Sequence, residues 1–114
     1  MIALAKRALA VVLFGAASAA MAQSFVVPPE LWDRPRTGRA VLEQPAIREA
    51  VQVLLGQQGS RLMVHHSPTQ ESLLLAEELR AWLVALALEP ARLTLQNDLK
   101  LSDPLRIEVR EDGN

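Results

Sequence analysis

The first regular pattern along the chain is an apolar stripe between two breaks. Apolar residues recur there at intervals of three and four, which is the spacing of one helix face: Ile47, Ala50, Val51 and Leu54. Pro45 suits the first position of a helix, and Gly56 and Gly59 mark its end. The pattern therefore predicts a helix from Pro45 to these glycines.

A second and longer stripe predicts a second helix. Its apolar positions again follow helical spacing: Leu75, Leu79, Trp82, Leu83 and Leu86, widened by Leu74, Ala81, Ala85 and Leu88. Ser67 is a suitable N-cap, Pro68 would be the first helical residue, and Gln70 would complete a capping box with Ser67. Pro90 ends the helix, because helical geometry is disfavoured just before a proline.

Shorter stretches have the pattern of β-strands. Residues 61–66 are fairly apolar on both faces, which predicts a central strand. One face carries Leu62, Val64 and His66, and the other carries Met63 and His65. Residues 39–42 predict a short first strand, residues 92–95 a third, and residues 105–110 alternate strictly, as half-exposed strands do.

Taken in order, the predicted elements are strand, helix, strand, helix, strand and strand. Each strand–helix–strand unit should cross over right-handed, which places both helices on the same side. The expected fold class is therefore α+β: a small mixed β-sheet with two helices packed on one face.

The N-terminal segment has the organisation of a secretory signal peptide. Lys6 and Arg7 precede a short apolar stretch, and residues 20–22 read Ala-Met-Ala, a small-x-small pattern typical of a cleavage site. The apolar stretch is shorter than the ~20 residues that span a membrane. We expect residues 1–22 to be removed, leaving a soluble periplasmic chain that begins at Gln23 and does not span a membrane.

The next segment, residues 23–38, contains three prolines and ends in a glycine, so it predicts neither a helix nor a central strand. We expect an extended arm laid over a domain of residues 39–110, followed by a frayed tail of residues 111–114. Phe25 and Trp32 in this arm are candidates for contact with a partner. The alternative is that Trp32 simply caps the core, as buried aromatic residues usually do.

Composition narrows the possible functions. The 114 residues include 12 Lys and Arg, 13 Asp and Glu, and no Cys. This near balance argues against nucleic-acid binding, which needs a basic excess. The lack of cysteine excludes disulfides, a thiolate nucleophile and a cysteine zinc site, and no cofactor is expected.

The adjacent histidines His65 and His66 are the first candidates for chemistry. Neighbouring residues on a strand point to opposite faces, so the pair is poorly placed to bind one metal ion. We expect one of them at the edge of the core and the other facing solvent. Ser67 follows them, but the chain has no G-x-S-x-G nucleophile elbow and no glycine-rich phosphate loop. Neither a metal site nor enzyme activity is therefore expected.

Three stretches together point to a known family. A strand ending in HHSP (residues 65–68) precedes a helix that contains R-A-x-x-V (residues 80–84), and the last predicted strand reads LRIEV (residues 105–109). This combination resembles the OmpA-like C-terminal domain, the peptidoglycan-associating module of Gram-negative envelope proteins. The resemblance implies contact with peptidoglycan, with Arg80, His66 and Ser67 as the ligand-binding candidates.

At the site that this resemblance implies, the chain departs from the family. There, an aspartate after a His-Thr pair and the helix arginine hold the diaminopimelate of the stem peptide by charge pairing. Here Pro68 stands at the aspartate position, Leu73 stands at an asparagine position, and Glu77 adds a like charge near a substrate carboxylate. We therefore expect a shortened, diverged domain that has lost this site.

Three functions follow, in order of preference. The first is a non-catalytic periplasmic binding or adaptor module that contacts another envelope protein through the arm or a sheet edge. The second is residual peptidoglycan binding through Arg80. The third is a small metal protein or enzyme that depends on His65 or His66.

Overall fold

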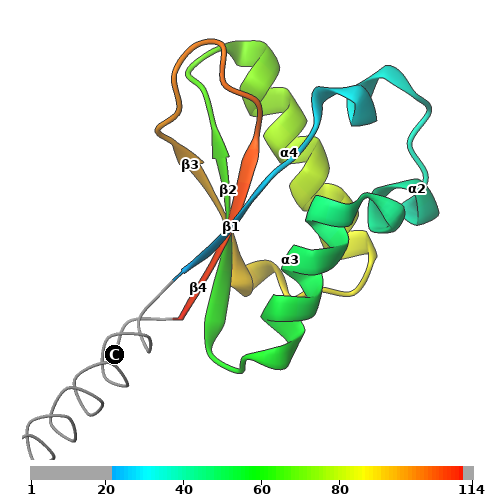
Figure 1. Cartoon of the computed structure of the whole chain (residues 1–114), viewed down its shortest axis with the longest axis vertical. Coiled ribbons are helices and arrows are strands. Elements are labelled where there is room, and N and C mark those ends of the chain that lie inside the picture. The colour runs from blue at the N-terminus through cyan, green and yellow to red at the C-terminus, as the bar shows by residue number, and fades with distance from the viewer. Residues whose placement is uncertain (1–21, 112–114) are drawn as a thin grey trace, which may run out of the picture.

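The computed structural model describes residues 22–111, which fold into one sheet covered by helices (Figure 1). The strands are β1 (Gln23–Val26), β2 (Ser60–His66), β3 (Leu93–Asn97) and β4 (Arg106–Glu111). The helices are α2 (Gly38–Glu43), α3 (Pro45–Gly56) and α4 (Gln70–Ala85), with 3-10 turns η2 (Pro29–Asp33) and η3 (Pro90–Arg92). The predicted signal peptide lies outside the described residues, apart from its last position.

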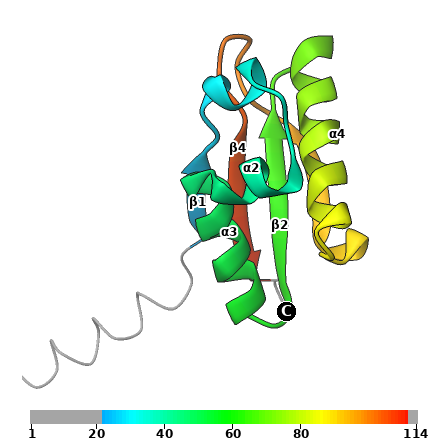
Figure 2. The same cartoon turned by 90° about the vertical axis from the view of Figure 1, so that its right-hand side faces the viewer.

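The four strands lie in the order β1-β4-β2-β3, so the last of the described strands is inserted between the first two (Figure 2). β4 runs antiparallel to both β1 and β2, whereas β2 and β3 are parallel. Leu62 of β2 lies opposite Val109 of β4 and Leu93 of β3, so apolar side chains form rows across the sheet. The prediction of a central strand at residues 61–66 is confirmed.

The helices α2, α3 and α4 all pack on one face of the sheet, and within residues 22–111 no helix covers the other face (Figure 2). The largest buried apolar side chains between the two layers are Val41, Ile47, Leu54, Leu62, Val64, Leu79, Leu83 and Ile107. The predicted α+β class is confirmed, with three helices on that face rather than two. Over the same residues, no helix has the length and apolar character needed to cross a membrane.

The predicted first strand at residues 39–42 is wrong, because these residues belong to α2. Thr37 caps this helix, and its Oγ1 accepts a hydrogen bond from the Ala40 backbone N–H at 3.0 Å. The first strand is instead β1, an edge strand inside the predicted arm, which ends before Pro28 because proline has no N–H for a sheet ladder. Glu111 is the last residue of β4 rather than the first of a frayed tail.

The start of α4 differs from the prediction. Thr69 is the N-cap, and its Oγ1 accepts a hydrogen bond from the Ser72 backbone N–H at 3.1 Å. The predicted capping box of Ser67 and Gln70 is therefore wrong, and Pro68 lies before the helix. Ser67 instead donates its backbone N–H to Ser72 Oγ at 2.9 Å, which ties the end of β2 to the first turn of α4.

The stripe predicted on α4 is narrower than expected. Its centre is buried at Ala76, Leu79 and Leu83, whereas Leu74, Ala81 and Ala85 are exposed rather than part of the buried face.

α4 ends in a Schellman motif that contains no glycine. The Leu88 N–H donates to the Leu83 carbonyl at 3.1 Å, and the Ala87 N–H donates to the Val84 carbonyl at 3.0 Å. Ala87 has a φ of 78°, in the left-handed region that favours glycine. Leu83 and Leu88 are both buried, so the apolar contact that accompanies this motif is present. The helix thus ends by its own hydrogen bonds, ahead of the proline that was predicted to stop it.

A few residues after the end of α4, Arg92 joins three segments. Its Nη2 donates to the carbonyls of Leu54 at 2.8 Å and Gln57 at 3.0 Å, and its Nε donates to the carbonyl of Ser60 at 3.0 Å. The first two carbonyls lie at the C-terminus of α3, where helix carbonyls lack partners and a cation is favourable. Arg92 therefore fixes the turn from α3 into β2.

Candidate functional site

The arm, residues 23–38, is fixed to α4 by charged and aromatic side chains. Arg36 donates from Nε to Glu78 Oε2 at 2.7 Å and from Nη2 to Glu78 Oε1 at 3.0 Å. The Arg36 guanidinium lies 5.4 Å from the centre of the Trp32 ring. Trp82 Nε1 donates to the same Glu78 carboxylate at 3.1 Å. The arm is thus a packed part of the domain.

This cluster also sets the ionisation of its acid. The hydrogen bond from Arg36 lowers the pKa of Glu78, partial burial raises it, and the hydrogen bond from Trp82 lowers it further. The net effect is a pKa below the ordinary glutamate value, so Glu78 is ionised at neutral pH.

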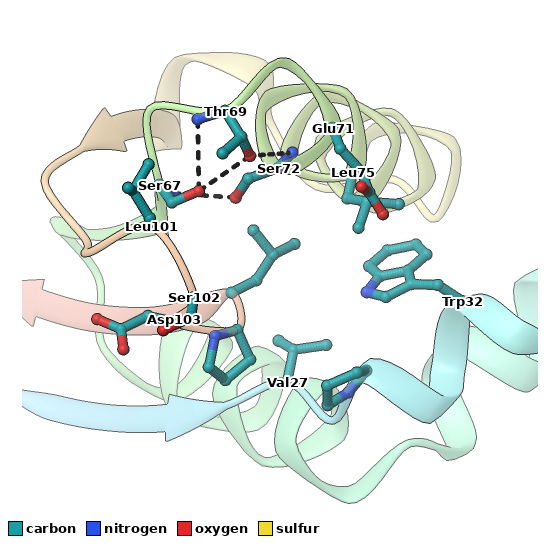
Figure 3. A pocket seen from close by; sticks show the side chains of 13 residues that line it. Val27, Trp32, Ser67, Thr69, Glu71, Ser72, Leu75, Leu101, Ser102 and Asp103 are labelled. Carbon is teal, nitrogen blue, oxygen red and sulfur yellow. Dashed lines mark hydrogen bonds between the residues drawn. The ribbon is translucent and has the colours of Figure 1, made fainter.

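The two aromatic residues predicted to contact a partner lie in different surroundings. Phe25 stands on β1 opposite Ile107 and packs against the core. Trp32 is partly buried, and part of its ring faces a pocket (Figure 3). Of the two, only Trp32 lines this pocket.

The pocket has a volume of about 260 Å³ and lies between the arm, the start of α4 and the loop that leads into β4 (Figure 3). Apolar side chains form much of its wall, among them Trp32, Leu75 and Leu101. On the side of α4 it is lined by hydroxyl groups: Ser67, Thr69 and Ser72. We call this cavity the arm pocket.

The hydroxyl groups of the arm pocket form a connected network. Ser67 Oγ and Thr69 Oγ1 are 3.1 Å apart, and the Thr69 N–H donates to Ser67 Oγ at 3.5 Å. Ser72 joins them through the two bonds that fix the start of α4 (Figure 3). The pocket lining includes no histidine that could activate one of these hydroxyls as a nucleophile. The arrangement fits binding rather than covalent chemistry.

Two carboxylates and no cation belong to the lining of the arm pocket. Glu71 comes from the first turn of α4 and is exposed. Asp103 comes from the loop before β4, and its Oδ2 accepts a hydrogen bond from the Lys100 backbone N–H at 3.1 Å. The pocket therefore has a negative rim contributed by two separate segments.

His65 and His66 are both buried, with 4% and 5% of their surface exposed, so the prediction that one faces solvent is wrong. His65 lies on the sheet face without helices, between two acids. Its Nδ1 is 2.8 Å from Asp98 Oδ1, and its Nε2 is 2.8 Å from Glu108 Oε1. Both ring nitrogens are thus directed at carboxylate oxygens of neighbouring segments.

The three candidates taken from the family resemblance do not meet at one site. His66 Nδ1 donates to the Ser67 carbonyl at 2.8 Å. Arg80 donates from Nη2 to the Pro90 carbonyl at 3.2 Å and from Nε to the Leu93 carbonyl at 3.4 Å. Leu93 begins β3, about four residues or ~13 Å along the sheet from the level of His66. Only Ser67 belongs to the arm pocket.

Within residues 22–111, no group of three or more His, Asp or Glu side chains is arranged to hold a metal ion. The two acids beside His65 approach opposite edges of its ring, so the three groups do not converge on one point.

Comparisons of the chain with protein-family models, with curated proteins and with solved structures found no match. The resemblance to OmpA-like domains stays a hypothesis from the sequence, and the function has to be inferred from the site itself.

Sequence reasoning found Trp32 and Ser67 but missed the rest of the arm pocket. Glu71 could not be distinguished by sequence from the other polar residues of its helix. Leu101 and Asp103 lie in a connection that has no regular pattern of apolar residues. One signal was available, because Leu99 and Leu101 are apolar residues in a largely polar connection.

Proposed function

We propose that this chain is an exported, non-catalytic binding module of the cell envelope that contacts another envelope protein through the arm pocket. The pocket itself carries the proposal. It is open to the surface, has an apolar wall containing Trp32, and has no activated nucleophile. Export rests on the sequence of residues 1–22, and the diverged OmpA-like motif supports a place in the envelope.

The alternative functions have less support. Peptidoglycan binding through Arg80 would need a free guanidinium, whereas Arg80 is bonded to two backbone carbonyls. A histidine-dependent activity would need a ring nitrogen that faces a ligand. Those of His65 face Asp98 and Glu108, Nδ1 of His66 donates to the Ser67 carbonyl, and neither histidine lines the arm pocket. The arm pocket, in contrast, combines an apolar wall with hydroxyl and carboxylate groups at an opening to the surface.

Export is tested by expressing the full chain in a Gram-negative host and fractionating the cells. We expect the protein in the periplasmic fraction with Gln23 as its N-terminal residue. Recovery from the cytoplasm with its N-terminal segment intact would contradict export. The processed protein recovered this way is the material for the experiments below.

Contact through the arm pocket is tested by photo-crosslinking in living cells. A photoreactive residue replaces Leu101, which lines the pocket and is 72% exposed. The matched control replaces Leu55, which is 62% exposed near the end of α3, at the opposite end of the domain (Figure 1). We expect a discrete protein adduct from position 101 alone, and its loss when Trp32→Ala is added. Equal adducts from both positions would contradict the proposal.

Co-sedimentation with purified sacculi distinguishes peptidoglycan binding through Arg80 from protein binding through the arm pocket. We expect no pelleting that depends on Arg80. Pelleting that Arg80→Ala abolishes and Trp32→Ala leaves intact would favour the family site over the arm pocket.

A further inference from the structure

We infer that the occupant of the arm pocket is a peptide segment that carries a positively charged side chain beside an apolar one. This inference rests on the function proposed above and specifies the chemistry of the partner. It follows from the size of the pocket, from its charge and from its aromatic wall.

The size of the arm pocket favours a side chain over a whole small molecule. Its volume of about 260 Å³ lies just below the ~300 Å³ at which pockets for drug-sized ligands begin. Trp32, Leu75 and Leu101 together offer apolar surface to one aliphatic or aromatic group. A segment of a partner protein can insert one such side chain while the rest of it lies across the rim.

The charge of the arm pocket indicates which kind of residue stands beside the apolar side chain in the partner segment. Glu71 forms no ion pair and no side-chain hydrogen bond with another described residue. Asp103 uses Oδ2 in a turn and leaves Oδ1 without a partner among the described residues. An acid in the first turn of a helix is favourable on its own, which accounts for Glu71 but not for Asp103. Glu71 and Asp103 both belong to the lining of a cavity that no cation lines, so the rim complements a positive charge.

The aromatic wall is compatible with the same partner. Trp32 already has a guanidinium beside its ring, that of Arg36. Arg36 is paired with Glu78 and does not line the arm pocket, so its charge does not offset Glu71 and Asp103 there. Another part of the Trp32 ring faces the arm pocket, where an incoming side chain can contact it (Figure 3).

Three dipeptides test this inference: acetyl-Leu-Lys-amide, acetyl-Leu-Gln-amide and acetyl-Leu-Glu-amide. Binding to the processed protein is followed by NMR through the backbone amides of Ser67, Thr69 and Ser72 and the indole N–H of Trp32. We expect the lysine peptide to bind about two- to five-fold more tightly than the glutamine peptide, within the range for exposed charge pairs. The glutamate peptide should bind most weakly, and higher salt should reduce the differences.

The variant Glu71→Gln with Asp103→Asn keeps the shape of the rim and removes its charge. We expect it to lose the preference for lysine while its affinity for the glutamine peptide stays unchanged. The control Glu49→Gln with Glu77→Gln makes the same change of net charge at exposed positions outside the pocket lining and should keep the preference.

The outcomes separate this inference from the proposed function. If all three peptides bind equally, the charge inference is wrong and the arm pocket still binds peptides. If none shifts the pocket signals while the N-acetylglucosamine dimer does, the occupant is a glycan and both proposals fall. If neither peptide nor glycan shifts these signals, the arm pocket is not a binding site.

Discussion

Replacing Ala87 with glycine should stabilise the protein. Ala87 adopts a φ of 78° at the end of α4, and a residue with a Cβ loses roughly 1–2 kcal/mol in this conformation. Glycine avoids that cost but gives the unfolded chain more freedom, which offsets about 0.4–1 kcal/mol. Because Ala87 is exposed, its methyl group contributes little packing. We therefore expect a net gain of about 0.5–1 kcal/mol in the free energy of unfolding.

Urea and thermal unfolding, followed by circular dichroism, measure this gain. For a domain of this size, about 0.5–1 kcal/mol corresponds to a rise in Tm of about 2–8 °C. The urea m-value should stay the same, since the surface exposed on unfolding does not change. Ala81→Gly is the matched control, because Ala81 is also exposed but lies inside α4. It should lower the free energy of unfolding by about 1 kcal/mol.

The sign of the change in the free energy of unfolding shows whether residue 87 has the left-handed conformation. If Ala87→Gly destabilises the protein as much as Ala81→Gly does, position 87 behaves as ordinary helix and the left-handed end of α4 is refuted. Ala87→Val is a second check, because a β-branched side chain is poorly tolerated at positive φ and should destabilise the protein.

Three further predictions concern the polar groups that join segments of the fold. Arg92→Ala should lower the free energy of unfolding, measured in urea, by about 2–3 kcal/mol, because charged hydrogen bonds to carbonyls of α3 and β2 are lost. Arg92→Lys should not restore this stability, because lysine cannot reach the same carbonyls with a planar set of donors. Full rescue by lysine would show that the positive charge alone matters. His65→Gln should lower the free energy of unfolding by about 1–3 kcal/mol. Asp98→Asn should lower it less in the His65→Gln variant than in the wild type, because the two side chains share a hydrogen bond. Strictly additive losses in this double-mutant cycle would contradict the prediction. Glu78→Gln should destabilise the protein at pH 7, and this effect should shrink as the pH falls below about 4, because the lowered pKa of Glu78 gives stability that is present above the unfolded pKa and is lost as the pH falls through the folded pKa. Its exposed neighbour Glu77 provides the control, and Glu77→Gln should change stability little over this range.

The elements that sequence reasoning predicted are those with a strong local signal. Pro45 and the stripe that follows it define α3, and the two apolar faces of residues 61–66 define a central strand. The strict alternation of residues 105–110 places β4 within one residue. In each of these elements, the apolar residues recur with the period of a helix or a strand, so the element can be predicted without knowledge of the rest of the fold.

Short segments were not predictable in this way. Residues 39–42 are too few for a helical or strand period of apolar residues to be recognised. The cap at Thr37 favours a helix there. Proline content excluded a central strand in the arm and indicated an extended segment, but it did not show that the residues before Pro28 pair as an edge strand. The start of α4 was predicted from a cap at Ser67, whereas Thr69, two residues later and of an equally suitable type, is the cap.

The arm pocket is harder still to foresee, since it exists only in the folded chain. Trp32 comes from the arm, Glu71 from α4 and Asp103 from a loop, and no sequence spacing relates the three. The same is true of His65, which is buried on the open face of the sheet because Asp98 and Glu108 from two other segments cover its ring nitrogens. Contacts between distant segments decide both features.

The position of β4 has a consequence for when the protein can fold. β4 is synthesised last, yet it is the neighbour of both β1 and β2 in the sheet. Until Arg106–Glu111 has emerged, β1 has no strand to pair with and Ile107 is missing from the core. Sheets that depend on such distant pairings form slowly, after the whole chain is available. An incomplete chain therefore lacks its native sheet, and an exported chain of this topology would still be unfolded while it is being translocated.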